Sequence, residues 1–151
     1  MVSTRQTQAD ELTELASRLR LAVARTARRL RQHAGTDLSA ALTAALATVE
    51  RHGPLTPSEL AELEGIKRPT ATRIVARLSE QDLVERAEDP QDRRSSLISA
   101  TGRGRSLLRR LRGRKNAYLA RRLRELDQAD VDALERATAV LERMLESERR
   151  P

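Results

Sequence analysis

The chain has 151 residues, with 29 Lys or Arg against 22 Asp or Glu and a formal net charge of +7. It has no Cys, Trp or Phe, one Tyr and two His, which excludes disulfides, thiol chemistry, Cys-based zinc sites and aromatic platforms for single-stranded nucleic acid. The sequence also lacks paired acids in an apolar setting and a Gly-rich phosphate loop. We therefore expect one domain that is not an enzyme and needs no metal or cofactor.

The sequence predicts a cytoplasmic protein with no membrane partner. No apolar run approaches the ~18 residues that cross a bilayer. Residues 1–10 are polar where a signal peptide would have an apolar segment.

The positive charge is concentrated in one part of the chain. Residues 67–114 carry thirteen Lys or Arg against six acids, whereas residues 37–66 carry one Arg against five acids. A concentrated basic segment favours a specific footprint for a polyanion over a surface that is basic only for solubility.

Two helices are expected first. Apolar residues at spacings of three and four predict a long amphipathic helix over 8–35, which Gly35 ends. A second helix is expected to open near Thr36-Asp37 and to end at His52-Gly53-Pro54. The stripe of the first helix consists of Leu12, Leu15, Leu19, Val23, Ala27 and Leu30.

The start of a third helix is marked by the segment Thr56-Pro57-Ser58-Glu59. It has a capping threonine, a proline in the first helical position and a glutamate that completes a capping box. Leu60 and Leu63 are expected to form its buried side, and Gly65 to end it.

A fourth, short helix follows after a tight connection. Its expected cap, Arg68, is a poor one, so its first N–H groups are left for another partner such as a phosphate oxygen. Pro69 is expected in the first helical position, and the helix ends near Asp82. The two short helices predict a helix-turn-helix unit. The expected buried residues of the fourth helix are Ile74, Val75 and Leu78.

The period of the sequence then changes from helix to strand. Leu83–Ala87 and Ser96–Ala100 are expected to be short strands, and the segment between them is polar and charged. A hairpin with a charged tip directly after the second short helix predicts a winged helix-turn-helix over residues 36–101.

Residues 102–148 are expected to be helical, with Gly113 as a possible bend and Asp127 as the cap of a last helix. The predicted stripe of the earlier part extends to Leu126. Three long amphipathic helices expose more apolar face than one small winged module can cover. We expect 8–35 and 102–148 to pair with a second copy, the alternative being a monomeric bundle.

Residues 60–104 resemble the MarR family of bacterial winged helix-turn-helix transcription regulators. The resemblance rests on the wing segment Asp-Pro-Gln-Asp-Arg-Arg, residues 89–94, which follows a Thr-Ala-Thr-Arg helix, residues 70–73. The chain departs from the family at Ala100-Thr101, where Leu-Thr is usual, and at Arg68, where a better cap is common. The resemblance implies a mainly α fold with a small β-hairpin and dimerisation helices at both ends, as a single unit over 1–151.

The resemblance also implies a homodimeric, sequence-specific regulator of double-stranded DNA. We expect a repressor that binds an inverted repeat and is relieved by a small-molecule effector. The alternative is an architectural protein that coats nucleic acid without sequence preference. The implied effector position is near the first, second and fifth helices, where no polar constellation in the sequence identifies a pocket.

Candidate DNA contacts lie on the second short helix and on the wing. Arg and Thr side chains on the first exposed turns of a recognition helix suit base contacts in the major groove, and Arg77 suits phosphate. Thr56 is either a phosphate contact or only a cap. The resemblance implies that Arg94 enters the minor groove while Asp92 orients it, with Arg93 and Arg86 on the backbone. The predicted DNA-binding residues are Thr56, Ser58, Lys67, Arg68, Thr70, Thr72, Arg73, Arg77, Arg86, Asp92, Arg93 and Arg94.

Other charged residues have weaker predictions. His33 and His52 lie near helix ends, where they are expected to complement the helix dipole. The cluster Arg103, Arg105, Arg109, Arg110 and Arg112 either adds to the general positive field or is a solvated helix surface.

Overall fold

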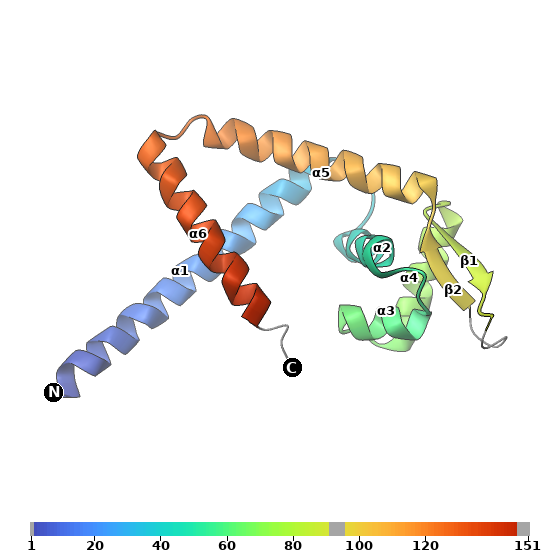
Figure 1. Cartoon of the computed structure of the whole chain (residues 1–151), viewed down its shortest axis with the longest axis horizontal. Coiled ribbons are helices and arrows are strands. Elements are labelled where there is room, and N and C mark those ends of the chain that lie inside the picture. The colour runs from blue at the N-terminus through green and yellow to red at the C-terminus, as the bar shows by residue number, and fades with distance from the viewer. Residues whose placement is uncertain (1, 91–95, 148–151) are drawn as a thin grey trace. The chain divides into compact units, whose positions relative to one another are not determined.

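The computed structural model describes residues 2–90 and 96–147 and is mainly helical with one two-stranded hairpin, which confirms the predicted fold class. None of the described helices combines the length and apolar character that a membrane span requires. In chain order the elements are α1 (Val2–Ala34), α2 (Ala40–His52), α3 (Pro57–Glu64), α4 (Arg68–Glu80), β1 (Val84–Glu88), β2 (Ser96–Ala100), α5 (Gly102–Leu123) and α6 (Gln128–Ser147) (Figure 1).

The chain divides into two compact units, residues 1–115 and residues 116–151. The first holds α1 to α4, the hairpin and the first part of α5. The second holds the end of α5 and α6. All the predicted DNA-binding residues belong to the first unit.

One apolar core joins the helix-turn-helix to the hairpin. Figure 1 shows α2, α3, α4 and the two strands gathered around it. Fully burying one such aliphatic side chain contributes about 1.5–3 kcal/mol. The core therefore fixes which side of α4 faces inward. Its most enclosed side chains are Leu46, Leu60, Val75, Leu78 and Ile98.

The hairpin is antiparallel, with Val84 opposite Ala100 and Glu88 opposite Ser96. β1 begins one residue later than predicted, because Leu83 is buried at the end of the preceding turn and its N–H donates to the carbonyl of Leu78 at 2.9 Å. The base of the hairpin is tied to the segment before α3 by two backbone hydrogen bonds between Leu55 and Ile98, of 3.1 and 2.8 Å.

The predicted opening of α2 near Thr36-Asp37 is wrong by a few residues. The helix begins at Ala40, and Ser39 is the N-cap, whose hydroxyl accepts a hydrogen bond from the N–H of Leu42 at 3.2 Å. The threonine hydroxyl instead accepts from the N–H of Leu38 at 3.2 Å and shapes the connecting segment. Gly53 ends α2 as predicted.

The buried sides of the two short helices also differ in detail from the prediction. Leu63 is 53% exposed, and Ala61 is buried beside Leu60 in its place. Because the side of α3 that faces the core lies between Leu60 and Ala61, Leu63 points roughly a third of a turn away from that direction. In α4, Ile74 is only partly buried and packs at the edge of the core. The helix ends at Glu80 rather than near Asp82.

The last two helices follow the prediction with one shift. α5 runs through Gly113 as a single helix, but it ends at Leu123, so Leu126 belongs to the turn and not to the helical stripe. Asp127 caps α6 as predicted, its Oδ1 accepting from the N–H of Asp130 at 2.8 Å.

Large apolar side chains on α1 and α6 remain exposed in the single chain. Leu12, Leu15 and Val23 of α1 are 61%, 55% and 50% exposed. On α6, Leu134 and Leu145 are 46% and 61% exposed. These two helices carry the uncovered apolar face that the sequence predicted.

Candidate nucleic-acid interface

The start of α3 is held by the predicted capping box. The Thr56 hydroxyl accepts from the N–H of Glu59 at 3.2 Å, and the Glu59 carboxylate accepts from the N–H of Thr56 at 2.7 Å. Hydrogen bonds from the backbone and then the hydroxyl of Thr56 lower the pKa of the Glu59 carboxyl. The Thr56 hydroxyl is thus occupied as a cap. Ser58, partly buried in the first turn, makes no side-chain hydrogen bond to a described residue.

α4, in contrast, begins without a side-chain cap. Lys67 is its N-cap, and the Lys67 carbonyl accepts from the N–H groups of Thr70 and Ala71 at 2.9 and 3.1 Å. Arg68 and Pro69 therefore each lie one position further into the helix than predicted. No acidic residue lies in the first turn. The positive end of the helix dipole is left uncompensated and favours an anion.

The packing of α4 turns a basic face to solvent. Ala71, Val75 and Leu78 are fully enclosed by the core on one side of the helix. None of the cations on the opposite side forms an ion pair with a residue in the described ranges. The exposed residues of this outer face are Lys67, Arg68, Thr72, Arg73 and Arg77, with Thr70 partly buried beside them.

Two side chains of the outer face bond to their own helix. The Thr72 hydroxyl donates to the carbonyl of Arg68 at 3.1 Å, and Arg73 Nε donates to the carbonyl of Pro69 at 3.4 Å. A 3.4 Å hydrogen bond is weak, and the guanidinium keeps its other donors for an external acceptor.

Of the DNA contacts predicted on the hairpin, Arg86 alone lies within the described residues. Arg86 is exposed on β1, opposite Ile98. Asp92, Arg93 and Arg94 at the tip lie outside the described residues, so their roles stay predictions.

A close approach sets how the hairpin joins α5. The Thr101 hydroxyl donates to the carbonyl of Asp82 at 2.6 Å and accepts from the N–H of Gly104 at 3.0 Å. A Cβ at position 104 would lie 2.2 Å from the carbonyl oxygen of Leu83. Glycine is required there, and the contact fixes the base of the wing against the first turn of α5.

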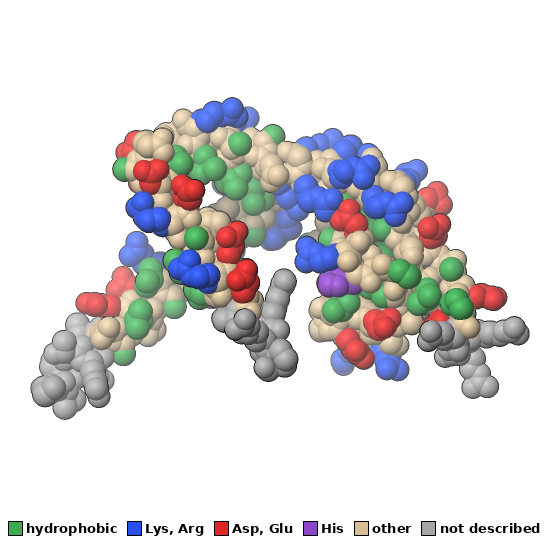
Figure 2. Space-filling model, in the orientation of Figure 1, with side chains coloured by type: hydrophobic (Ala, Val, Ile, Leu, Met, Phe, Trp, Pro, Cys, Tyr) green, Lys and Arg blue, Asp and Glu red, His purple; other side chains and the backbone are tan. Residues whose placement is uncertain are grey.

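Arginines gather over the first half of α5, as Figure 2 shows. Arg112 forms a two-pronged ion pair with Glu50 of α2, with N–O distances of 2.8 and 3.1 Å. This hydrogen bonding, and then the charges of Arg112, Arg109 and Arg105, lower the pKa of Glu50. From the sequence, the arginine cluster of α5 was expected either to add to the general positive field or to be a solvated helix surface. The partner of Arg112 is 62 residues away, so no local pattern signals it.

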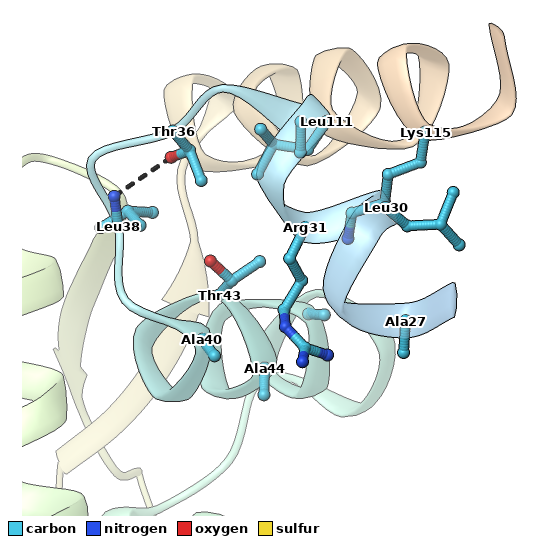
Figure 3. Close-up of a pocket in the computed structure, with 12 residues that line it drawn as sticks. Ala27, Leu30, Arg31, Thr36, Leu38, Ala40, Thr43, Ala44, Leu111 and Lys115 are labelled. Atoms are coloured by element: carbon cyan, nitrogen blue, oxygen red, sulfur yellow. Dashed lines mark hydrogen bonds between the residues drawn. The ribbon is translucent and has the colours of Figure 1, made fainter. Parts of the chain in front are cut away.

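A cavity of about 530 Å³ lies between α1, α2 and the first part of α5 (Figure 3). Five alanines and three leucines line most of it. Its polar lining consists of Arg31, Thr36, Thr43 and Lys115. Arg31, Thr36 and Thr43 lie in one stretch of the chain at irregular spacing, whereas Lys115 is far from them in sequence, so no local pattern brings the four together.

The two histidines lie in the last turns of α1 and α2, where the sequence placed them. The His33 Nδ1 lies 3.1 Å from the carbonyl oxygen of Arg29. Within residues 2–90 and 96–147, no three His, Asp or Glu side chains are placed to hold a metal ion.

The comparisons with known proteins agree on one family. The model of the MarR family matches residues 38–96. The HTH-type transcriptional regulator MT0903.1 of Mycobacterium tuberculosis is 35% identical over 133 residues, covering 87% of this chain and 93% of that protein. The HTH-type transcriptional repressor NicR of Pseudomonas putida is 30% identical over 105 residues, covering 68% of this chain and 63% of NicR. A solved structure from Pseudomonas aeruginosa PA01 has a TM-score of 0.80 at 28% identity, covering 88% of this chain and 95% of that one.

The matched residues 38–96 include the helix-turn-helix and the hairpin described above. The relatives are named as transcriptional regulators, which confirms the prediction that the chain is not an enzyme. The fold is the winged helix-turn-helix that the sequence predicted. The chain is a transcription regulator and belongs to the MarR family.

Proposed function

We propose that the chain is a homodimeric repressor that binds an inverted-repeat operator and releases it when a small molecule binds. The observation that carries this is the start of α4, which has no side-chain cap and no acid in its first turn, together with an outer face whose cations form no ion pair with a described residue. In the absence of DNA, that combination leaves donors and positive charge unsatisfied.

In this proposal α4 is the recognition helix and lies in the major groove. Arginine suits a bidentate contact with guanine, and the threonine methyl suits the thymine methyl. Arg68, Thr70, Thr72 and Arg73 would meet bases. The other proposed contacts, to phosphate or at the wing, are Ser58, Lys67, Arg77, Arg86, Asp92, Arg93 and Arg94. Thr56, which was the other candidate, keeps its role as a cap, because its hydroxyl and N–H are both bonded to Glu59.

The homodimer is supported by the exposed leucines of α1 and α6. We propose that residues 36–101 bind DNA and that 8–35 and 102–148 dimerise. A two-fold dimer would place two recognition helices on half-sites about one helical turn apart, which requires an inverted repeat. Repression is supported by the relative NicR, which is named as a repressor.

The test is operator binding by Arg73→Ala, on a duplex selected from random sequence with the wild-type protein. Losing a bidentate base contact should weaken binding roughly ten- to a hundredfold, measured by fluorescence anisotropy. Arg136→Ala is the matched control, since it removes an exposed arginine from α6. Equal operator affinities of the two variants would contradict the role of α4.

The architectural alternative is tested in the same assay by competition with unrelated DNA. A sequence-specific regulator should prefer its selected duplex by a factor of roughly 10³ or more. Both modes weaken with salt through counterion release, so only the ratio of affinities separates them. Equal affinity for scrambled DNA would overturn the proposal in favour of the alternative.

A further inference from the structure

We propose that the outer face of the first half of α5 binds the phosphate backbone of a second DNA segment while α4 holds the operator. The part played by α4 rests on the proposed function, whereas the binding face on α5 does not. This face, called the α5 patch below, consists of Arg103, Arg109 and Arg110.

α5 carries positive charge only. Its 22 residues include eight Arg and one Lys but no Asp or Glu, and Figure 2 shows blue side chains gathered along this helix. Every exposed residue between positions 102 and 114 is an arginine or a glycine. Like charges held close together on one helix repel each other, so an anion that covers this surface is bound favourably.

The three arginines of the α5 patch have no acidic partner among the described residues. Arg103 and Arg109 form neither a hydrogen bond nor an ion pair with a described side chain or carbonyl. Arg110 donates to the neutral hydroxyl of Ser106, at 3.1 Å. The guanidinium groups therefore keep most of their donors for an external acceptor.

The neighbouring arginines of α5, in contrast, are used within the fold. Arg112 pairs with Glu50 of α2, and Arg105 donates to the carbonyl of Ala100 at the end of β2. Together with the buried Leu108, these contacts fix the first half of α5 against α2 and the hairpin. The α5 patch is thus presented on a rigid support.

The α5 patch begins at the opposite end of α4 from the proposed base contacts. The Thr101 hydroxyl donates to the carbonyl of Asp82, just beyond the C-terminal end of α4, and Arg103 follows closely in the chain. The proposed base contacts, residues 68–73, lie at the N-terminal end of this 13-residue helix, and such a helix is about 20 Å long. Figure 1 also shows α5 and α3 on different sides of α2. DNA bound to the patch therefore leaves the reading end of α4 free.

The composition of the patch fits a phosphate backbone better than an acidic protein. Protein interfaces are anchored by apolar or aromatic side chains at their centre, and no exposed residue between positions 102 and 114 is apolar. Arginine binds phosphates through charge and paired N–H donors and needs no apolar contact. Arg103 and Arg110 are seven residues apart, so they project from the same side of α5, about 10 Å apart along its axis. Both can then meet phosphates of one duplex.

A second copy of the chain is a poor partner for the patch. A two-fold interface placed there would bring the arginines of both copies together, and facing like charges weaken an interface. The uncovered leucines lie elsewhere, on α1, on α6 and, within α5, at Leu119 beyond the patch. We therefore expect the α5 patch to stay exposed in the proposed dimer.

The test is the capture of a second duplex by protein that is already bound to its operator. The operator duplex selected with the wild type is fixed to beads, loaded with the full chain and washed, so that the recognition helices are occupied. A fluorescent duplex of unrelated sequence is then added at increasing salt. Its capture should fall with a log–log slope of roughly −3, because each of three neutralised phosphates contributes about −0.9. The absence of capture by the wild type would overturn the proposal.

The triple variant Arg103→Gln, Arg109→Gln and Arg110→Gln locates the capture. It should retain roughly tenfold less of the second duplex, because it removes three phosphate contacts, and should bind a short operator duplex as the wild type does. The corresponding triple Lys variant keeps the charge and should capture nearly as well as the wild type. A Lys variant as poor as the Gln variant would overturn a contact made through charge.

The matched control is the triple variant Arg124→Gln, Arg136→Gln and Arg143→Gln. It removes the same charge from exposed positions beyond the patch and should capture the second duplex normally. Circular dichroism melting checks that each variant is folded. Equal capture by the folded control and the folded patch variant would overturn the assignment to α5.

The same materials separate the alternative roles of the patch. Polyglutamate at equal charge concentration should displace the second duplex less well than unlabelled DNA does, and equal displacement would overturn DNA in favour of an acidic protein. Weaker binding of the patch variant to the short operator duplex would overturn the second segment, because the patch would then touch the operator itself. Loss of the dimer in the patch variant, measured by sedimentation, would place the patch in the dimer interface and overturn the proposal.

Failure of this inference can be told from failure of the proposed function. Normal operator affinity without capture overturns the α5 patch and leaves the proposed function. Patch-dependent capture by a wild type that does not prefer its selected duplex overturns the proposed function and leaves the patch.

Discussion

At position 104 the first turn of α5 passes against the carbonyl of Leu83, where a Cβ would lie 2.2 Å from the oxygen. We expect Gly104→Ala to destabilise the fold by about 1–3 kcal/mol, the usual range for overpacking, in urea unfolding followed by circular dichroism. Gly113→Ala is the same change on the same helix, with no atom within 4 Å of the added carbon. It should stabilise by about 0.5–1 kcal/mol, because alanine is the better helix former. If both substitutions changed the free energy of unfolding in the same direction, the close approach of Gly104 to the carbonyl of Leu83 would be contradicted.

Residues were predictable from the sequence where their partners are near in the chain. The capping box at Thr56 involves residues three apart, so the sequence alone was enough to find it. The pairing of Arg112 with Glu50 and the steric role of Gly104 depend on distant segments. The operator bases cannot be predicted from the residues of α4, because one arginine can meet either a base or a phosphate.

At the scale of elements, the ion pair between Glu50 and Arg112 joins α2 to α5. Because the pKa of folded Glu50 lies below its usual value of 4.5, the pair stabilises the fold above that pH. This contribution is lost as the pH falls through the lowered pKa. We expect Glu50→Gln to be less stable than the wild type at pH 7, by a small amount since the pair is partly exposed.

The measurement is the midpoint of urea unfolding between pH 7 and pH 3 for both proteins. The difference between them should shrink on acidification and vanish once Glu50 is protonated in both states. Glu142→Gln, which removes an exposed carboxylate from α6, controls for the loss of one negative charge. A difference that grows toward acid pH would have the wrong sign for this pair.

The elements themselves were predicted from periodicity and caps, whereas some boundaries were not. Gly35 and Gly65 ended their helices as expected, since each adopts a left-handed backbone that favours glycine. Gly53 also ends its helix as expected, but in an extended backbone that does not itself need glycine. The start of α2 was misplaced because two nearby hydroxyl residues, Thr36 and Ser39, can both act as caps, and it is the Ser39 hydroxyl that accepts from the first turn of the helix. The prediction that Leu63 is buried was wrong, because the side of so short a helix that faces inward depends on the elements packed around it.

At the scale of the whole molecule, the exposed leucines of α1 make dimerisation testable. Leu15→Glu should convert a dimer into monomers in sedimentation equilibrium, because it would bury an unpaired charge in the interface. Leu63→Glu is the matched control, since Leu15 and Leu63 are 55% and 53% exposed in the single chain. The control should stay dimeric, and a Leu15→Glu protein that does so too would contradict the proposed interface.

The surplus of apolar surface could be read from the sequence, but the cavity could not. A stripe of leucines along one helix is a periodic pattern, and counting such stripes against a small core is enough to predict that they need cover. The residues that line the cavity follow no periodic pattern in the sequence. It exists because the end of α1, the face of α2 and the middle of α5 meet, which only the fold determines.

Because the exposed leucines of α1 need a second copy to cover them, the apparent stability of the protein should depend on its concentration. If folding and assembly are linked, mass action adds about 1.4 kcal/mol of apparent stability for each tenfold rise in chain concentration above the dissociation constant. The melting temperature should then climb as the sample is concentrated. In a cell, a chain at a concentration below that constant would be monomeric. It would then contact only one half-site of the DNA and expose its leucines to solvent, so a low chain concentration would by itself abolish operator binding.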